Sequence, residues 1–409
     1  MGIIRFILAI TIVFVHSPWQ GLNLFVGSTN ALRLFFMISG FLISYVLIEK
    51  KSYSTTKAFY INRYLRLYPL YLIVAILSIV GQALGFKRSI HVLWCFCLIF
   101  ILVKKKDYIK ANIFFTLLFY IAIIIPGSYI FFKLFQSFPS ASEFYKNLPL
   151  PAAILLITSN ITLFGQDLVM FSSIKNNNLI FPKEFWDSDV LLWLGLFVPQ
   201  AWSVGVELTF YIIAPFLLPR KKLIYLMLLL SLTLRIYLIK IGIGLQDPWN
   251  YRFFPTELTL FLLGALSHQV LLPFYKKIFH TKINFYSILF TLLLIAALPL
   301  YHSIPIEGVK KSIFFIIFVA ALLPFSFIFN NICYIDNWIG NLSYPIYLSH
   351  FVALGMCNFI LQELGIENNK YVSTIGMVII SIILSILLNK LVDDSFKGVR
   401  NKFRTPILG

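Results

Sequence analysis

The sequence predicts an all-α protein, a polytopic bundle of about 10–12 transmembrane helices with both termini in the cytoplasm. Hydrophobic residues make up 59% of the 409 residues, and the mean hydropathy is +0.87. A water-soluble core does not need that composition, whereas membrane spans require apolar runs of about 20 residues, and such runs repeat along this chain. Lys and Arg gather in the short segments between the runs, where they set the orientation of a membrane protein.

The apolar runs give the expected spans and their order. They lie at about 3–19, 30–49, 66–86, 90–103, 111–133, 201–218, 223–240, 255–272, 285–302, 311–329, 340–361 and 371–391. The run at 90–103 is short for a full crossing, and 150–165 is expected to be a partial or interfacial helix. We expect one membrane-embedded domain over residues 1–409.

The distribution of basic residues assigns the two sides of the membrane. One set of loops, together with the tail at 392–409, carries far more Lys and Arg than the other set, so it is expected in the cytoplasm. The segment at about 134–200 then lies outside the cell membrane. A loop of that length is usually functional or disordered. We expect it to cover an outer cleft and to touch a substrate there.

Several function classes are excluded by composition and motifs. The net charge of +18 comes largely from loop residues that set topology, so it does not indicate a nucleic-acid partner. The four cysteines form no CxxC pair and no metal-ligand spacing, so we expect free thiols and no metal. There is no P-loop, GxSxG or HExxH motif.

An arginine and a histidine stand in the first apolar run. Arg5 and His16 are eleven residues apart, which on an α-helix places them on one stripe, about 20° apart and about 16 Å apart in height. On the expected topology Arg5 lies near the inner face and His16 in the outer half. Ionisable groups at membrane depth are functional candidates. The alternative is that Arg5 is a flanking anchor and His16 an interfacial residue.

Two motifs follow in the second and third runs. Ser39 and Gly40 are small residues inside a span, which usually indicates close helix packing. Arg63 and Arg66 share one helical face at the inner membrane boundary, where two guanidinium groups can bind phosphate. Ordinary anchoring of Arg63 and Arg66 to lipid headgroups is the alternative.

The span at 201–218 carries a carboxylate. Glu207 lies five residues beyond Trp202, too deep for a loop charge, and Tyr211 follows one turn later on the same face. Trp202 alone is typical of an interfacial aromatic belt. A carboxylate in lipid needs a partner, so Glu207 is the stronger functional candidate.

The span at 255–272 shows a similar pattern. Pro255 suits a first helical position, so Glu257 falls in the first turn, where the helix dipole fully accounts for a carboxylate. Arg252 is a candidate ion partner or anion contact. His268, at the far end of the span, is expected to have no functional role.

The last constellation lies in IGNLSYPIYLSHF. Ser343, Tyr347 and His350 share one face if the segment is helical throughout. Pro345 suggests that the helix begins only there, which weakens the assignment of Ser343.

Taken in order, these stretches resemble the acyltransferase-3 family of integral membrane acyltransferases. Arg5 and His16 match its arginine–ten residues–histidine signature, Ser39-Gly40-Phe41 its second-span motif, and Arg63-x-x-Arg66 its third. AWSVGVELTFY resembles a further family segment, with Val204 and Gly205 as departures, and RFFPTELTLFLLGA and SYPIYLSHF resemble two more. The resemblance covers about residues 3–361. The spans at about 90–133 look additional to the family core.

The resemblance implies an O-acyltransferase. Its donor would be an acyl-CoA, usually acetyl-CoA, presented from the cytoplasm, and its acceptor a hydroxyl of a cell-surface or lipid-linked glycan, such as O-antigen or capsule. The implied catalytic residues are His16, as general base, and Glu207. The implied donor-binding residues are Arg5, Arg63, Arg66, Ser39 and Gly40. Substrate contact or structural support is expected from Trp202, Tyr211, Arg252, Glu257, Ser343, Tyr347 and His350.

A second class of function uses the same residues. A transporter or flippase for an anionic or lipid-linked substrate would also place charges along its path. The lack of a detectable inverted repeat counts mildly against it. Either function implies a multi-pass protein of the cell membrane, the inner membrane in a Gram-negative bacterium, in contact with lipid.

Overall fold

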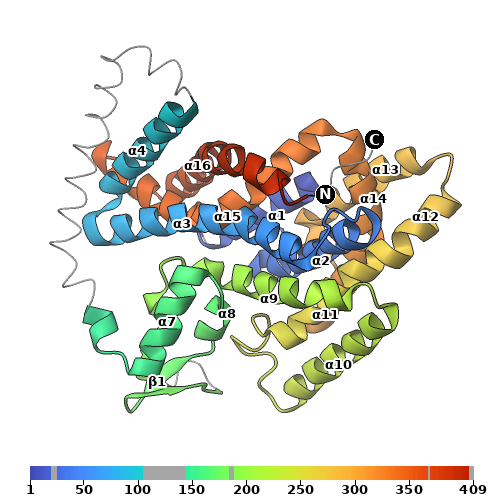
Figure 1. Ribbon diagram of the computed structural model, residues 1–409, viewed down its shortest axis with the longest axis horizontal. Helices are drawn as coiled ribbons and strands as arrows, with labels where there is room; N and C mark the ends of the chain where they lie inside the picture. Colours follow the sequence, from blue (N-terminus) through green and yellow to red (C-terminus); the bar gives the residue numbers. More distant parts are fainter. Residues whose placement is uncertain (20–24, 105–142, 184–187, 367–368, 405–409) are drawn as a thin grey trace.

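A computed structural model describes residues 1–19, 25–104, 143–183, 188–366 and 369–404 of the chain. The all-α prediction is confirmed: helices make up nearly all of the regular structure in these residues (Figure 1). The α-helices are α1 (Gly2–Val15), α2 (Gly27–Ser44), α3 (Thr56–Leu84), α4 (Phe86–Lys104), α7 (Leu150–Thr162), α8 (Gln166–Val169), α9 (Trp202–Leu217), α10 (Lys221–Lys240), α11 (Phe254–Leu266), α12 (Leu272–Ile278), α13 (Ile283–Ala297), α14 (Gly308–Ile332), α15 (Tyr334–Glu363) and α16 (Lys370–Asn401).

Each predicted span within the described residues coincides with a helix, and the one at 111–133 lies outside them. In the described part of the chain, seven helices are long and apolar enough to cross a membrane. They are Gly27–Glu49, Thr56–Leu84, Lys221–Lys240, Phe254–Ile278, Gly308–Ile332, Tyr334–Glu363 and Lys370–Val392. Helices α1 and α13 are shorter than the predicted spans, because prolines follow closely: α1 ends before Pro18, and after α13 the chain turns into a 3₁₀ segment at Pro299–Ser303.

Close helix contacts hold the bundle together where glycines remove side chains. A Cβ added to Gly40 of α2 would lie 1.9 Å from the Phe261 carbonyl oxygen of α11, and one added to Gly264 of α11 would lie 1.9 Å from that of Met37. A similar contact joins Gly2 of α1 to Gly340 of α15. These pairs bring backbones together as small residues do in membrane helix pairs. Gly40 is thus a packing residue at the α2–α11 contact.

Helix ends from distant parts of the sequence meet at one end of the bundle. There, Asp336 of α15 caps α1 by accepting hydrogen bonds from the backbone N–H groups of Gly2 (2.8 Å) and Ile3 (2.7 Å). Near the same end of α3, Asn62 donates to the Arg400 carbonyl of α16 (2.7 Å). These helix ends all belong to the side that the sequence assigns to the cytoplasm.

Two π-helical turns face each other beside the bundle. They are η1 (Tyr45–Glu49), which continues α2, and η4 (Ser267–Leu271), which continues α11. His268 joins them, because its Nδ1 lies 3.0 Å from Ser44 Oγ and its Nε2 lies 2.9 Å from Glu49. Both ring nitrogens therefore have partners, in agreement with the structural role expected for His268.

The segment predicted at 134–200 folds, where it is described, into α7, α8 and a small antiparallel sheet. The sheet has the order β2–β1–β3, formed by Asn178–Ile180, Ser173–Lys175 and Val190–Leu191. Asn176 and Asn177 make the β1–β2 turn with φ of 51° and 58°, a left-handed conformation that Asn tolerates better than most residues. The run of asparagines in the sequence is thus a hairpin turn.

Helix α8 carries a buried carboxylate beside the N-terminal end of α9. Asp167 is 7% exposed, its Oδ1 has no hydrogen-bond partner, and it packs against Gly205. Burial raises the pKa of Asp167 from 3.8 to about 6. The folded protein therefore favours the protonated carboxyl, so this group destabilises the fold progressively as pH rises from about 4 to 6.

We expect Asp167→Asn to stabilise the protein at pH 7.5 and to leave its stability at pH 4 unchanged, because the amide carries no charge to desolvate. The difference between the two pKa values corresponds to roughly 3 kcal/mol as an upper limit. Thermal unfolding of the detergent-solubilised protein between pH 4 and 8 measures this, with the exposed Asp189→Asn as control. A variant less stable than wild type at pH 7.5 would contradict it.

Candidate active site

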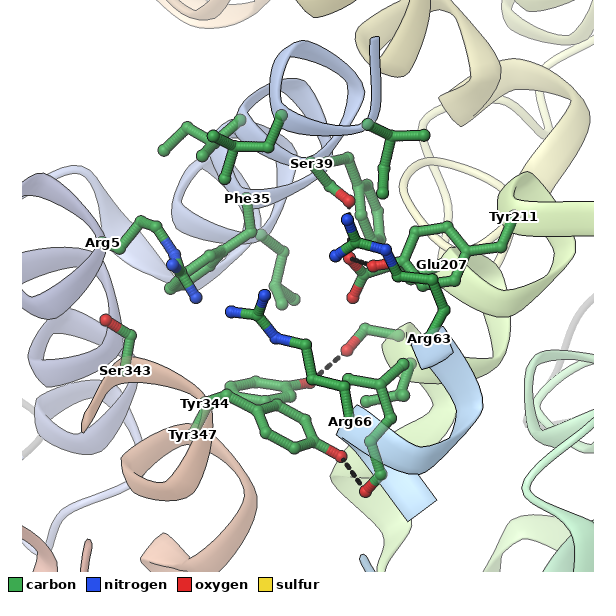
Figure 2. A pocket seen from close by; sticks show the side chains of 18 residues that line it. Arg5, Phe35, Ser39, Arg63, Arg66, Glu207, Tyr211, Ser343, Tyr344 and Tyr347 are labelled. Atoms are coloured by element: carbon green, nitrogen blue, oxygen red, sulfur yellow. Dashed lines mark hydrogen bonds between the residues drawn. The ribbon is translucent and has the colours of Figure 1, made fainter. Parts of the chain in front are cut away.

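A cavity of about 100 Å³ lies at the centre of the bundle, where α1, α2, α3, α9 and α15 meet. Figure 2 shows polar side chains from each helix around it. Its polar lining consists of Arg5, Ser39, Arg63, Arg66, Ser203, Glu207, Tyr211, Ser343, Tyr344 and Tyr347. The fold thus brings together eight of the residues that the sequence singled out, from motifs separated by up to 342 positions.

Three arginines point into this cavity from two helices, Arg5 from α1 and Arg63 and Arg66 from α3 (Figure 2). Within the described residues, none of their guanidinium groups forms a salt bridge or a side-chain hydrogen bond. Arg63 is 8% exposed, and its charge lies over the rings of Phe59 and Tyr211, 5.8 and 5.9 Å from their centroids. Clustered cations without counter-ions are suited to bind an anion.

A carboxylate stands opposite the arginines. Glu207 Oε1 accepts hydrogen bonds from Ser39 Oγ (2.5 Å) and from the hydroxyl of Tyr211, one turn later on α9. The family resemblance implies a catalytic role for Glu207 together with His16. In the described structure no hydrogen bond joins Glu207 to His16 or His350. Glu207 lines the central cavity, whereas His16 lines a different cavity.

Tyrosines on α15 set the wall of the cavity through backbone contacts. Tyr347 donates to the Gln200 carbonyl (2.6 Å) and lies 2.6 Å from Ser203 Oγ, while Tyr344 donates to the Leu67 carbonyl (2.9 Å). Helix α15 begins at Tyr334 and contains Pro345, so the expected helix start at that proline was wrong. Ser343 therefore does share the face of Tyr347.

A smaller cavity of about 40 Å³ adjoins the central one on the side of the α1 and α15 starts. Arg5, Arg66 and Tyr344 line both cavities. Asn341, Asn389 and Arg400 complete its polar lining. We call it the inner cavity, because its helix ends lie on the side assigned to the cytoplasm.

A third cavity, of about 230 Å³, lies at the opposite end of the bundle, and we call it the outer cavity. Leu32 lines both it and the central cavity. Its other lining residues are His16, Ser28, Met170, Trp193, Pro199, Gln200, Trp202, Asp247, Tyr251, Arg252 and Phe351. Met170, Trp193, Pro199 and Gln200 come from the segment predicted to cover an outer cleft. Three cavities with shared walls thus follow one another through the bundle.

His16 opens into the outer cavity from the C-terminal end of α1. Its Nδ1 lies 2.9 Å from the Ile12 carbonyl oxygen, which can only accept, so Nδ1 carries a hydrogen. In the neutral ring Nε2 is then a free base. His16 is the C-cap residue of α1, which ends at Val15, whereas the predicted span continued to residue 19.

A second histidine stacks on the first. The rings of His16 and His350 have centroids 5.0 Å apart, and Phe351 packs against both, at 5.1 and 4.4 Å. His350 is fully buried, its Nδ1 lies 2.6 Å from the Tyr347 carbonyl oxygen, and its Nε2 has no partner. Two imidazoles with the same tautomer therefore stack on each other, His16 lining the outer cavity and His350 buried behind it.

Three predicted site residues, Gly40, Glu257 and His350, line none of the three cavities. Gly40 was expected in the donor site, but it packs against α11, so only Ser39 of that motif reaches the central cavity. Glu257 is fully buried in the first turn of α11, as expected, and binds Arg235 of α10 (2.7 Å). Arg252 is not its partner, because Arg252 turns to Asp247 and the outer cavity.

Several polar cavity residues were not singled out in the sequence, among them Tyr344, Arg400, Gln200 and Asp247. Tyr344 is adjacent to Ser343 in a motif already noted, so the motif itself was a signal. Arg400 counted only as a cytoplasmic charge. Nothing in the local pattern around Gln200 or Asp247 distinguishes them from loop residues.

Glu257 should act through stability. Glu257→Gln would leave Arg235 and the neighbouring Arg33 without a compensating buried charge, and breaking such a pair usually costs about 3–5 kcal/mol. We expect a markedly lower unfolding temperature in nanodiscs, whereas Glu363→Gln on the exposed end of α15 should change it little. Unchanged stability with lost substrate binding would instead place Glu257 at a substrate.

Comparison with known proteins places the chain among membrane acyltransferases. The family described as an acyltransferase domain, acyltransferase-3, matches residues 168–390. A relative from Aquifex aeolicus (strain VF5), described as an uncharacterized protein, is 26% identical over 213 residues, 50% of this chain and 89% of the relative. No solved structure matches. Because the family match covers more than half of the chain, including α9, α11 and α15 of the cavities, the protein belongs to the acyltransferase-3 family and is a membrane acyltransferase.

Proposed function

We propose that the protein transfers an acyl group, most simply acetyl, from a cytoplasmic acyl-CoA to a hydroxyl of an extracytoplasmic glycan. The observation that carries the proposal is the order of the three cavities. Arg5 and Arg66, which form no salt bridge within the described residues, line both the inner and the central cavity, and a histidine with a free Nε2 stands in the outer one. The family match favours this function over a transporter or flippase.

The inner and central cavities suit the donor. The nucleotide end of acyl-CoA carries several phosphate charges, and guanidinium groups bind phosphate through paired hydrogen bonds. Arg5 and Arg66 stand where the two cavities join, so they can hold this end while the thin pantetheine arm passes on toward Leu32. Glu207 does not bind the phosphates, since it would repel them. Together with Ser39 and Tyr211 it forms a polar wall for the amides of that arm.

The outer cavity suits the acceptor step. His16 Nε2 removes the proton of the acceptor hydroxyl as the oxygen attacks the thioester carbon. A new C–O bond forms and the C–S bond breaks. The proton on His16 then neutralises the departing thiolate, which leaves as free CoA. Every atom transferred comes from the two substrates.

The two halves of the site can be separated by mutation. His16→Gln keeps a hydrogen-bond donor on a side chain of similar size but removes the base. It should therefore lower glycan acylation at least about 100-fold while leaving acyl-CoA affinity within about twofold. The double variant Arg63→Gln/Arg66→Gln should weaken acyl-CoA binding about tenfold or more. Binding is measured in nanodiscs by calorimetry, and transfer by mass spectrometry of the glycan.

A matched control is Arg220→Gln, which removes a guanidinium from the loop before α10, at the cytoplasmic side but outside all three cavities described here. It should change neither quantity. Full acylation by the His16 variant would remove this residue from the mechanism. Unchanged acyl-CoA affinity in the double arginine variant would mean that these residues only anchor the helix to lipid headgroups.

A further inference from the structure

The outer cavity differs from the central one in how its charges are compensated. Among its described lining residues, Asp247 and Arg252 are the only ones besides His16 that can carry charge. They pair with each other in two parallel hydrogen bonds, Nε to Oδ1 at 2.6 Å and Nη2 to Oδ2 at 3.0 Å. The cavity wall is therefore polar but has no net charge when His16 is neutral.

The Nε and Nη2 donors of Arg252 are all used within the cavity wall. Nη2 also lies 2.5 Å from the Tyr251 hydroxyl, and Nη1 lies 3.7 Å from Met170 Sδ. Its Cζ also lies 4.6 Å from the ring centroids of both Trp202 and Tyr251, which contact each other edge to face at 5.5 Å. Such stacking and pairing fix the group as part of the wall. An incoming carboxylate or phosphate would have to displace Asp247 to bind the Nε–Nη2 edge of the guanidinium.

The loop that carries this pair is itself held from two helices. The Asn250 carbonyl accepts hydrogen bonds from Arg33 of α2 (2.8 Å) and from Arg235 of α10 (3.4 Å). Arg235 is in turn fixed by Glu257 of α11. The backbone between Asp247 and Arg252 is therefore tied to α2 and α10.

Other groups in the outer cavity suit a hydroxyl-bearing ligand. Gln200 donates from Nε2 to the Leu348 carbonyl (2.6 Å), which fixes the amide orientation, and its buried Oε1 has no partner. A free amide oxygen accepts a hydrogen bond from a hydroxyl but repels a carboxylate. Trp193 and Phe351 add apolar ring surface at the rim, as is common in sites that bind sugar-sized molecules.

We propose that the outer cavity selects uncharged, hydroxyl-bearing sugar residues and rejects acidic ones, and that Asp247 sets this selectivity by neutralising Arg252. The proposal rests on the function proposed above, in which the outer cavity receives the acceptor. Removing Asp247 and removing Arg252 should therefore shift the selectivity between acidic and neutral sugars in opposite directions.

The test uses oligosaccharide pairs in which one member is neutral and the other has one primary alcohol oxidised to a carboxylate. Proteoliposomes receive acetyl-CoA and an equimolar panel of such pairs, and mass spectrometry measures the ester on each. Wild type should acylate the neutral members at least about tenfold faster. Asp247→Asn should raise the acidic-to-neutral ratio about tenfold, and Arg252→Gln should lower it further.

The control is Asp189→Asn, which removes an equal charge from the exposed hairpin outside the cavity and should leave the ratio unchanged. Because each ratio is taken within one variant, loss of folded protein does not mimic a shift. Equal acylation of acidic and neutral members by wild type, or shifts of the same sign in both variants, would overturn the proposal. If no panel member is acylated while acetyl-CoA still binds, the glycan acceptor itself is wrong and this proposal falls with it.

Discussion

Unpaired positive charge inside an apolar helix bundle is the constraint around which this structure is arranged. Arg5, Arg63 and Arg66 surround one cavity and have no salt-bridge partner among the described residues. Such groups are costly at membrane depth unless water or a ligand reaches them. Glu207, held by Ser39 and Tyr211, is the one carboxylate at that cavity and offsets part of the charge. The remainder is what an anionic donor would neutralise.

Elsewhere among the described residues, two carboxylates of the bundle pair with arginines. Glu257 lies against Arg235, and Asp247 lies against Arg252, both at the end of the bundle opposite the inner cavity. The charge along the path therefore changes. The central cavity has an excess of positive charge, whereas in the outer cavity the positive charge of Arg252 is paired with Asp247. The histidine with the free nitrogen stands at the balanced end. That gradient suits a reaction whose donor is a polyanion and whose acceptor is an alcohol.

Much of this arrangement could be predicted from the sequence because its signals are local. The spacing of Arg5 and His16 fixes them on one helix, and Arg63 and Arg66 on one face of another, so their meeting with Glu207 required only that these helices pack together. The lengths of spans were less predictable. Prolines after residues 15 and 297 end α1 and α13 early, which moved His16 to a helix end.

Partner choice was the part that sequence could not supply. Arg252 stands five residues from both Asp247 and Glu257, and only the fold of the intervening loop shows that it binds the first. Gly40 and Ser39 are neighbours, yet a helix turns adjacent residues by about 100°, so one reaches the cavity and the other packs on α11. Long-range contacts such as that of His350 with His16 have no local signature at all.

The central claim is that donor and acceptor enter from opposite ends of one path. The most direct measurement uses proteoliposomes of uniform orientation, with acyl-CoA supplied on one side of the bilayer and the glycan acceptor on the other. The account predicts acylated glycan only when acyl-CoA is on the side of the Arg400 end of α16 and the acceptor is on the side of His16. Efficient acylation with both substrates confined to the same side would contradict it.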